Sequence, residues 1–222
     1  MSYRVLIVDD HPLYRAALRG AIAAASPDCE FLEAGSMAAL FDTLEQTPQV
    51  DLLLLDLNLP GAHGFSALSY LRGAHPELPV IVVSAMDSPG TVQQALAFGA
   101  QGFVSKAADA ASIAASVQTA LRGELVAPAG SEHAAAGAMP DGTALDIAQR
   151  LSQLTPQQFR VFSMLCSGRL NKQIAFDLQI TEATVKAHMT AILRKLGAAN
   201  RTQAVLLAGR LALDPGEVRS QV

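Results

Sequence analysis

The feature that most constrains the fold is the alternation of short apolar runs with longer amphipathic segments over residues 3–122. The apolar runs predict strands at 5–8, 29–34, 52–55, 80–83 and 102–104, of which 29–34 has the weakest pattern. The other segments predict helices at 12–25, 37–46, 65–74, 89–98 and 110–122. Because strands that alternate with helices pair in parallel, we expect an α/β domain with a doubly wound, five-stranded sheet covered on both faces.

The rest of the chain has a different pattern. After residue 150 only helical patterns follow, at 156–167, 171–178, 182–196 and 201–210. The segment before them is rich in Ala, Gly and Pro, as linkers are, and leaves room for a short helix near 145–151. At 222 residues the chain exceeds the usual single domain of about 100–150. We expect a first domain over 1–122, a linker over 123–150 and an all-α four-helix domain over 151–222.

Charge is divided unevenly between these parts. Residues 1–150 hold 7 Lys and Arg against 16 Asp and Glu, a net charge of −9, whereas residues 151–222 hold 9 against 4, a net charge of +5. A basic small domain suits a polyanion, because neutralised phosphates release their condensed counterions. An acidic first domain suits a cation. Composition alone leaves a chance imbalance between solvated faces equally open.

No run of apolar residues approaches the ~18 that a membrane span requires, so the sequence predicts a cytoplasmic protein. The two cysteines, Cys29 and Cys166, lie far apart in the chain. They lack the spacing of metal ligands, and we expect them to be buried free thiols.

Polar residues stand at the carboxyl ends of the predicted strands. Asp9 and Asp10 follow the first strand, Asp56 the third, Ser84 the fourth and Lys106 the fifth. In a parallel sheet such ends converge on one crevice. Like charges about 4 Å apart repel by about 4 kcal/mol at an effective dielectric constant near 20, so three gathered carboxylates need a cation. A hard divalent ion such as Mg²⁺ meets that need.

Residues 3–122 resemble the receiver domains of two-component response regulators. The resemblance rests on Asp9-Asp10, the Asp56-Leu57-Asn58-Leu59-Pro60 stretch with Gly64 beyond it, Ser84, Gly99-Ala100, Phe103 and Lys106. It implies a flavodoxin-like fold with the strand order 2-1-3-4-5. It also implies that Asp56 accepts a phosphoryl group from a sensor histidine kinase.

The same resemblance implies the roles of the other residues. Asp10, Asp56 and the Asn58 main-chain carbonyl would hold Mg²⁺, Asp9 would act through water, and Lys106 would supply a fixed positive charge. Ser84 would hydrogen-bond the new phosphoryl oxygen, and the Phe103 ring would rotate into the space that the Ser84 loop vacates. Ala107 replaces the proline that follows the lysine in many receivers, which puts the usual cis peptide in doubt. Taken one at a time, these residues fit ordinary structural roles as helix caps, turn residues or core residues. Their occurrence together favours a phosphoryl site.

The basic part contains a predicted helix-turn-helix. Thr155 and Gln158 form a capping box at its first helix, and Asn171 is expected to cap the second. Only Gln179 and Ile180 separate the second helix from Thr181, the expected cap of the third. One face of the third helix is an apolar stripe of Val185, Met189, Ile192, Leu193 and Leu196. The opposite face holds the small and basic residues that a DNA major groove accepts, Ala183, Lys186, Ala187, Thr190 and Arg194.

Residues 154–205 resemble the LuxR/NarL-type DNA-binding domain, and the whole chain resembles a NarL/FixJ-type regulator. The matching residues are Leu154-Thr155, Gly168, Asn171-Lys172, Ile174-Ala175, Thr184-Val185-Lys186, His188, Lys195-Leu196 and Asn200-Arg201. The resemblance implies base and phosphate contacts near Lys186, Ala187 and Thr190. It implies DNA-backbone contacts for a second set of residues, Lys172, Thr184, His188 and Arg201. For His188 a purely structural role is equally open, and Gln158 replaces the usual glutamate of the opening pattern.

The final helix is apolar on more than one side. One side can pack on its own domain, and the other is expected to pair two protomers through Val205, Leu206 and Ala208. Such a homodimer would read two DNA half-sites about one turn apart. A fully buried terminal helix is the alternative.

These features favour a DNA-binding response regulator, and not an enzyme, in which phosphorylation of Asp56 controls transcription. In this hypothesis the unphosphorylated receiver blocks the recognition helix or the dimer surface. A second hypothesis is an orphan regulator that needs no phosphorylation. The intact acidic site argues against it. A third is an Mg-dependent phosphohydrolase, for which the sequence lacks an obvious substrate-pocket motif.

Overall fold

The computed structural model describes residues 2–47, 49–60, 62, 64–126 and 142–212. Its first part contains a five-stranded sheet in the order β2-β1-β3-β4-β5, with every neighbouring pair parallel. The strands are β1 (Tyr3–Val8), β2 (Cys29–Ala34), β3 (Leu52–Leu55), β4 (Val80–Ser84) and β5 (Gly102–Ser105). The predicted fold class and strand order are confirmed.

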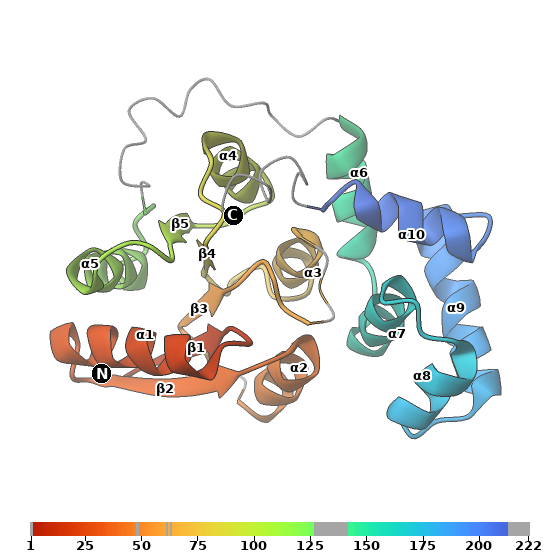
Figure 1. Ribbon diagram of the computed structural model, residues 1–222, viewed down its shortest axis with the longest axis horizontal. Helices are drawn as coiled ribbons and strands as arrows, with labels where there is room; N and C mark the ends of the chain where they lie inside the picture. Colours follow the sequence, from red (N-terminus) through yellow and green to blue (C-terminus); the bar gives the residue numbers. More distant parts are fainter. Residues whose placement is uncertain (1, 48, 61, 63, 127–141, 213–222) are drawn as a thin grey trace.

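Five helices cover the two faces of this sheet (Figure 1). They are α1 (Pro12–Ala25), α2 (Met37–Gln46), α3 (Ser66–Ala74), α4 (Pro89–Ala97) and α5 (Ala110–Leu121). Alternate residues of β1 face opposite ways: Val5 and Ile7 pack with α1 and α5, whereas Leu6 and Val8 pack on the side of α2, α3 and α4. Both faces are therefore buried, which explains why the strands are continuously apolar.

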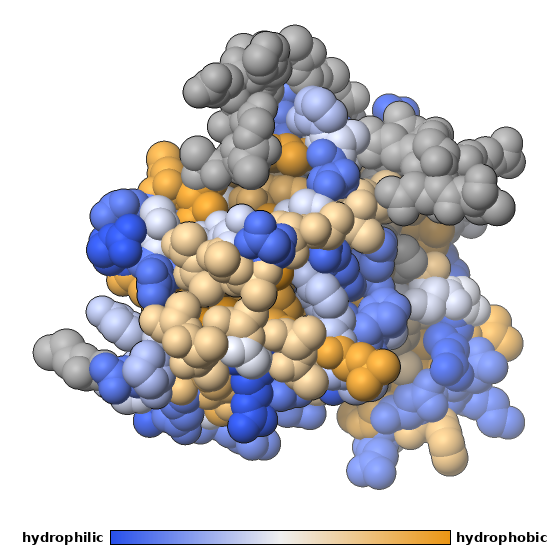
Figure 2. Space-filling model, turned by 60° about the vertical axis from the view of Figure 1, so that its left-hand side comes forward, coloured by the Kyte–Doolittle hydropathy of each residue, from blue (hydrophilic) through white to orange (hydrophobic). Residues whose placement is uncertain are grey.

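The outer surface of α1 and α5 is mildly hydrophobic (Figure 2). Alanines such as Ala16, Ala17 and Ala111 are exposed there, and α5 contains no charged residue. Leu13, at the start of α1, is 86% exposed. The two helices pack side by side over the sheet.

The second part is entirely helical. Its helices are α6 (Gly142–Leu151), α7 (Pro156–Cys166), α8 (Asn171–Asp177), α9 (Glu182–Leu196) and α10 (Arg201–Gly209). The helix α6 lies within the segment that the sequence predicted as a linker, of which residues 127–141 fall outside the described part of the chain. Since Ala144, Ile147, Ala148 and Leu151 are all buried, α6 is part of the packed structure.

Of the three predicted helix caps, two are confirmed and one is wrong. Thr155 and Gln158 form the expected capping box, in which the Thr155 hydroxyl accepts from the Gln158 amide at 3.3 Å and Gln158 Oε1 accepts from the Thr155 amide at 3.1 Å. The prediction that Asn171 caps α8 is wrong. Leu170 holds the cap position instead, because Gln173 Oε1 reaches back and accepts from the Leu170 amide at 2.8 Å.

Both cysteines are free and half-buried, and burial raises the pKa of Cys166 to about 12. Among the described helices, none combines the length and the apolarity needed to cross a bilayer.

The turn between α8 and α9 contains backbone strain at one residue. Gln179 has a φ of 53°, a left-handed conformation that normally favours glycine, and Gly197 adopts a similar one at the end of α9. We expect Gln179→Gly to stabilise the protein by about 1 kcal/mol, which raises the Tm by about 2–4 °C for a chain of this size. Gln179→Ala keeps the Cβ and should give no gain. Thermal unfolding checks both variants, and a lower Tm for Gln179→Gly would contradict this account.

Candidate functional site

The carboxyl ends of the strands bring the predicted polar residues to one edge of the sheet. Asp9 and Asp10 directly follow β1, Asp56 follows β3, and Ser84 ends β4. Parallel pairing fixes their places: the Asp56 amide donates to the Val8 carbonyl at 2.9 Å, and the Lys106 amide donates to the Ser84 carbonyl at 2.8 Å. The register of the sheet therefore brings together site residues that lie far apart in the sequence.

Lys106 reaches across this edge and binds two carboxylates. Its Nζ lies 2.7 Å from Asp9 Oδ2 and 2.8 Å from Asp56 Oδ2. Both aspartates are almost fully buried, with side chains 2% and 1% exposed. On the other side, Asp56 Oδ1 accepts from the Asn58 amide at 3.2 Å. The Asp56 carboxylate is therefore held in place from both sides.

Burial and charge act in opposite directions on these groups. Burial raises the pKa of Asp56, and the hydrogen bond and charge of Lys106 offset this only in part. For Lys106, burial lowers the pKa, but its hydrogen bonds and ion pairs with Asp56 and Asp9 outweigh burial, so that the pKa is raised. Lys106 therefore stays charged, and a further positive charge nearby would stabilise the ionised form of Asp56.

The acidic side chains fit a divalent cation. Ligand atoms of Asp9, Asp10, His11 and Asp56 all lie within 4.8 Å of one another. Asp9 Oδ2 and Asp10 Oδ1 are buried, and each lies 2.7 Å from a basic nitrogen, Lys106 Nζ and His11 Nδ1 respectively. Carboxylate oxygens gathered in this way match the hard oxygen ligands that Mg²⁺ prefers.

The predicted switch residues lie next to this cluster or in the core behind it. Ser84 is fully buried, and its Oγ accepts from the Met86 amide at 3.1 Å. Phe103 is only 3% exposed, so its ring is already in the core in this structure. The peptide bond before Ala107 is trans, because the described residues contain no cis peptide.

Sequence reasoning missed three residues of α1 and the turn before it. The His11 amide donates to Asp9 Oδ1 at 2.8 Å, and its Nδ1 lies 2.7 Å from Asp10 Oδ1. Arg15 Nη1 donates to the Asp9 carbonyl at 2.6 Å. The Tyr14 ring lies beneath Lys106 Nζ, 5.0 Å from the ring centroid. Their position within a turn and a half of the acidic pair was the available signal.

The predicted DNA-contacting face of α9 is open to solvent. Lys186, Ala187, Thr190 and Arg194 are exposed, as is Lys172 on α8. His188 is half-buried, and so is Thr184, whose amide donates to the capping Thr181 hydroxyl at 3.1 Å. The apolar stripe is buried as predicted at Val185, Met189, Ile192 and Leu196, with Leu193 half-buried.

Two basic residues of this part are already engaged within the protein. Arg201 Nη2 donates to the carbonyls of Arg169 at 2.5 Å and Leu165 at 3.3 Å, which ties the start of α10 to the end of α7. Lys195 Nζ donates to the Gln153 carbonyl at 2.8 Å and to Gln158 Oε1 at 2.7 Å. These contacts give Arg201 a structural role in addition to the DNA contact that the sequence implies.

The three predicted dimer residues differ in their exposure. Leu206 is 68% exposed, Val205 is half-buried, and Ala208 is buried within the chain. Just after α10 the chain contacts the first domain, where the Phe65 amide donates to the Leu211 carbonyl at 2.9 Å.

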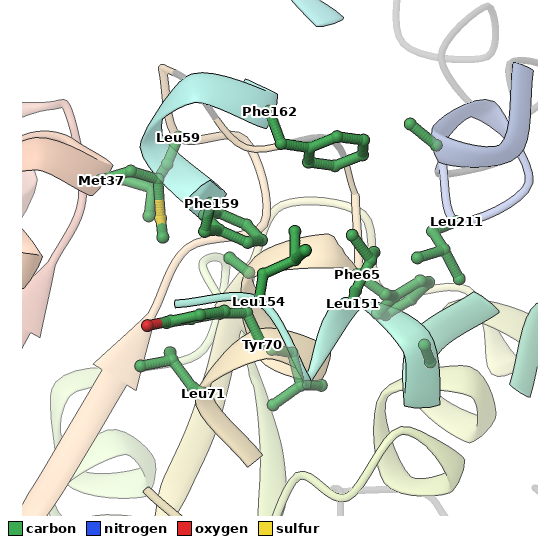
Figure 3. Close-up of a cluster of buried hydrophobic side chains, with 14 of the residues drawn as sticks. Met37, Leu59, Phe65, Tyr70, Leu71, Leu151, Leu154, Phe159, Phe162 and Leu211 are labelled. Carbon is green, nitrogen blue, oxygen red and sulfur yellow. The ribbon is translucent and has the colours of Figure 1, made fainter. Parts of the chain in front are cut away.

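Aromatic rings from both parts of the chain meet in one buried cluster (Figure 3). The ring centroid of Phe159 on α7 lies 4.5 Å from that of Tyr70 on α3 and 5.8 Å from that of Phe41 on α2. Phe41 and Tyr70 are 5.2 Å apart, edge to face. Each such pair contributes about 0.5–1.5 kcal/mol beyond the burial of its surface. The two domains therefore share a hydrophobic contact.

The loop that follows Asp56 takes part in this contact. Leu59 is buried, and Figure 3 shows it beside Met37 and close to α7. A cleft of about 550 Å³ lies next to it, lined by Pro60 on one side and Arg160 on the other. Arg160 pairs with Asp42 and lies over the Phe41 ring. The segment directly after Asp56 is thus in contact with the second domain.

The contact between α3 and the end of α6 is especially close. A Cβ placed on Gly73 would lie 2.0 Å from Ser152 Cβ and 2.8 Å from the Ser152 carbonyl oxygen. No larger residue fits at Gly73 while the domains stay docked. The receiver-like domain thus contacts α6, α7 and the end of α10, and it leaves the α9 face uncovered. Of the two alternatives, masking of the recognition helix or of the dimer surface, the first is not observed.

Residues 5–118 match the family model of the response regulator receiver domain, and residues 152–208 match that of the luxR family of bacterial regulatory proteins. The chain is 39% identical to the glycerol metabolism activator of Pseudomonas putida, over 93% of this chain and 95% of that protein. It is 33% identical to the nitrate/nitrite response regulator protein NarP of Escherichia coli, over 92% and 94%. In fold it is similar to the Salmonella typhimurium RcsB response regulator, with a TM-score of 0.56 at 20% identity, over 92% and 97%.

Proposed function

Because the chain belongs to the response regulators that join a receiver domain to a LuxR-family DNA-binding domain, we propose that phosphorylation of Asp56 controls its binding to DNA. The protein is a DNA-binding regulator of a two-component system. The observation that supports the finer proposal is the buried Asp56 carboxylate, which is held between Lys106 and the Asn58 amide at the acidic edge of the sheet.

Phosphoryl transfer at this site needs alignment and neutralisation of charge. An Asp56 oxygen attacks the phosphorus of a phosphohistidine on a sensor kinase, and the bond from phosphorus to the donor nitrogen breaks with its electron pair on nitrogen. Asp10, Asp56 and the Asn58 carbonyl would hold Mg²⁺, with Asp9 acting through water, and the bound ion would neutralise charge on the phosphoryl oxygens. Lys106 holds the carboxylate and then the phosphoryl group, and Ser84 is placed to donate its hydroxyl to a phosphoryl oxygen.

Intact mass spectrometry tests the transfer directly. Wild-type protein treated with acetyl phosphate and Mg²⁺ should gain one phosphoryl group, and chelation of Mg²⁺ should prevent the gain. Asp56→Asn should gain none, because an amide is a poor nucleophile. A wild-type protein that stays unmodified, or an Asp56→Asn variant that is modified equally, would exclude Asp56 as the acceptor.

We further propose that the domain contact keeps the unphosphorylated protein in a weakly binding form. The loop from Leu57 to Pro60 connects Asp56 with the cluster around Phe159, so a shift at the phosphorylated residue has a short path to α7. Docking also holds the end of α10 through Leu211. Release would free α10 to pair two DNA-binding domains through Val205 and Leu206, whereas Ala208 becomes available only if the packing around it changes.

The exposed face of α9 is the proposed DNA interface, with Lys186, Ala187, Thr190 and Arg194 in the major groove. Lys172, Thr184, His188 and Arg201 are proposed for the backbone contacts. Since the target is DNA, the proposal includes the cytoplasmic location that the sequence predicts.

Lys186 provides a test of this interface. We expect Lys186→Ala to weaken binding to any duplex and to lower the slope of log K against log salt by about one, because one phosphate contact is lost. Fluorescence anisotropy with a random-sequence duplex over a salt series measures the slope. Glu182→Ala, at the start of the same helix, is the control and should not lower the slope. An unchanged slope in Lys186→Ala would remove Lys186 from the interface.

The other two hypotheses make different predictions. An orphan regulator would bind DNA equally well with and without acetyl phosphate. A phosphohydrolase would release phosphate steadily from small phosphoesters, and Asp56→Ala would abolish the release. We propose that the protein is not an enzyme, since the buried Asp56 lies in a site that is completed by Lys106 and the acidic pair and adjoins a DNA-binding domain.

A further inference from the structure

The position of Lys106 depends on more than its two carboxylates. Its Nζ is shared between Asp9 Oδ2 and Asp56 Oδ2, at 2.7 and 2.8 Å, and its side chain is 15% exposed. The carboxylates approach the ammonium group from the sheet. The Tyr14 ring provides a further contact from α1, with its centroid 5.0 Å from Nζ. The ammonium group is thus held between two buried anions and an aromatic face.

Tyr14 is itself fixed by the fold. It stands in the first turn of α1, where its amide donates to the His11 carbonyl at 3.1 Å. Its ring packs against the core on the α1 and α5 side of the sheet. The Tyr14 hydroxyl is buried and has no hydrogen-bond partner among the described residues. What holds the ring at this place is therefore its packing and its contact with Lys106, and not a bond made by its hydroxyl.

We propose that Tyr14 is a positioning residue, whose ring holds the Lys106 ammonium group at the phosphorylation site while the partners of that group change. The inference rests on the proposed role of Asp56. The negative face of an aromatic ring attracts a cation without accepting a directed hydrogen bond. The ring can therefore hold Lys106 while its N–H groups stay free to donate to oxygen atoms.

This undirected attraction matters during phosphoryl transfer, because the hydrogen-bond partners of Lys106 then change. When an Asp56 oxygen forms its bond to phosphorus, the aspartate loses its own negative charge and the new charge lies on the phosphoryl oxygens. The ion pair that holds Lys106 at Asp56 Oδ2 is then lost, and the ammonium group must move to a phosphoryl oxygen. With the ring beneath it, Lys106 keeps the aromatic contact as well as its ion pair with Asp9 while its partner at Asp56 is exchanged.

Substitutions of Tyr14 separate the ring from the hydroxyl. We expect Tyr14→Leu, which keeps an apolar side chain against the core, to lower the rate of phosphorylation by acetyl phosphate and the affinity for beryllofluoride by about 3- to 20-fold. Tyr14→Phe keeps the aromatic face and should stay within about twofold of wild type. Leu13→Ala changes the exposed neighbouring residue and should have no effect.

A double-mutant cycle shows whether the effect passes through Lys106. In a Lys106→Ala background, Tyr14→Leu should cause no further loss of beryllofluoride affinity, because the cation that the ring holds is absent. An equal loss in both backgrounds would make Tyr14 a structural residue only. So would wild-type behaviour of Tyr14→Leu. If the wild-type protein itself takes up no phosphoryl group, the proposed function fails instead, and the two failures are distinguishable.

Discussion

The Asp56→Asn variant is expected to bind DNA with the same affinity before and after treatment with acetyl phosphate and Mg²⁺, whereas wild-type protein binds more tightly after treatment. The reason is that the loop after Asp56 contacts the DNA-binding domain, and in the proposed mechanism a phosphoryl group at Asp56 biases this contact toward release. If about 1% of the unmodified protein is in the released form, full release tightens the apparent Kd by up to about 100-fold.

Anisotropy titrations with a duplex selected from a random pool by beryllofluoride-treated wild-type protein measure this effect. Asp51→Asn is a matched control, since it removes an exposed carboxylate before β3 and leaves the phosphoryl site intact. It should respond to acetyl phosphate as wild type does. A full response in Asp56→Asn would contradict the proposed control by Asp56.

Gly73→Ala is expected to bind DNA tightly without phosphorylation. The added Cβ would lie 2.0 Å from Ser152 Cβ, which the docked arrangement cannot accommodate. Alanine in place of glycine within α3 also favours the helix by about 1 kcal/mol, so the receiver should remain folded while its contact with α6 opens. The expected affinity of the unmodified variant is close to that of phosphorylated wild type, and the stimulation by acetyl phosphate falls below about twofold.

Gly20→Ala serves as the control for this experiment. Gly20 lies within α1, and a Cβ placed there meets nothing within 4 Å. It should keep weak basal binding and the full response to acetyl phosphate. If Gly73→Ala also keeps both, the contact between α3 and α6 does not restrain DNA binding.

The strands, most helices and the acidic site could be predicted because their signals are local. Runs such as Leu52–Leu55 are continuously apolar, and the residues that end the strands are polar for a chemical reason. The place of Asn58 and Lys106 around Asp56 then follows from the strand order. The proposed role of Tyr14 needed the structure, because a tyrosine in the first turn of a helix is ordinarily a core residue.

The domain contact could not be predicted from patterns along the chain. Phe41, Tyr70 and Phe159 each fit the apolar face of their own helix, and nothing in their spacing says that they meet. The composition of 123–150 predicted a linker with a short helix near 145–151, but not that this helix begins at Gly142 and is packed into the structure, since alanine and glycine are typical of linkers and a closely packed helix needs small residues too. Both the domain contact and the packing of α6 depend on contacts between residues far apart in the chain, which local patterns do not show.

One backbone amide reports directly on the proposed control. The Phe65 N–H donates across the domain contact to the Leu211 carbonyl at 2.9 Å, so its protection from hydrogen exchange requires the docked form. The Leu53 amide, which donates to Pro79 within the receiver, is an internal reference. By NMR-detected exchange, beryllofluoride should remove the protection of Phe65 and leave that of Leu53 unchanged. If Phe65 stays protected while DNA binding tightens, phosphorylation does not act by opening this contact.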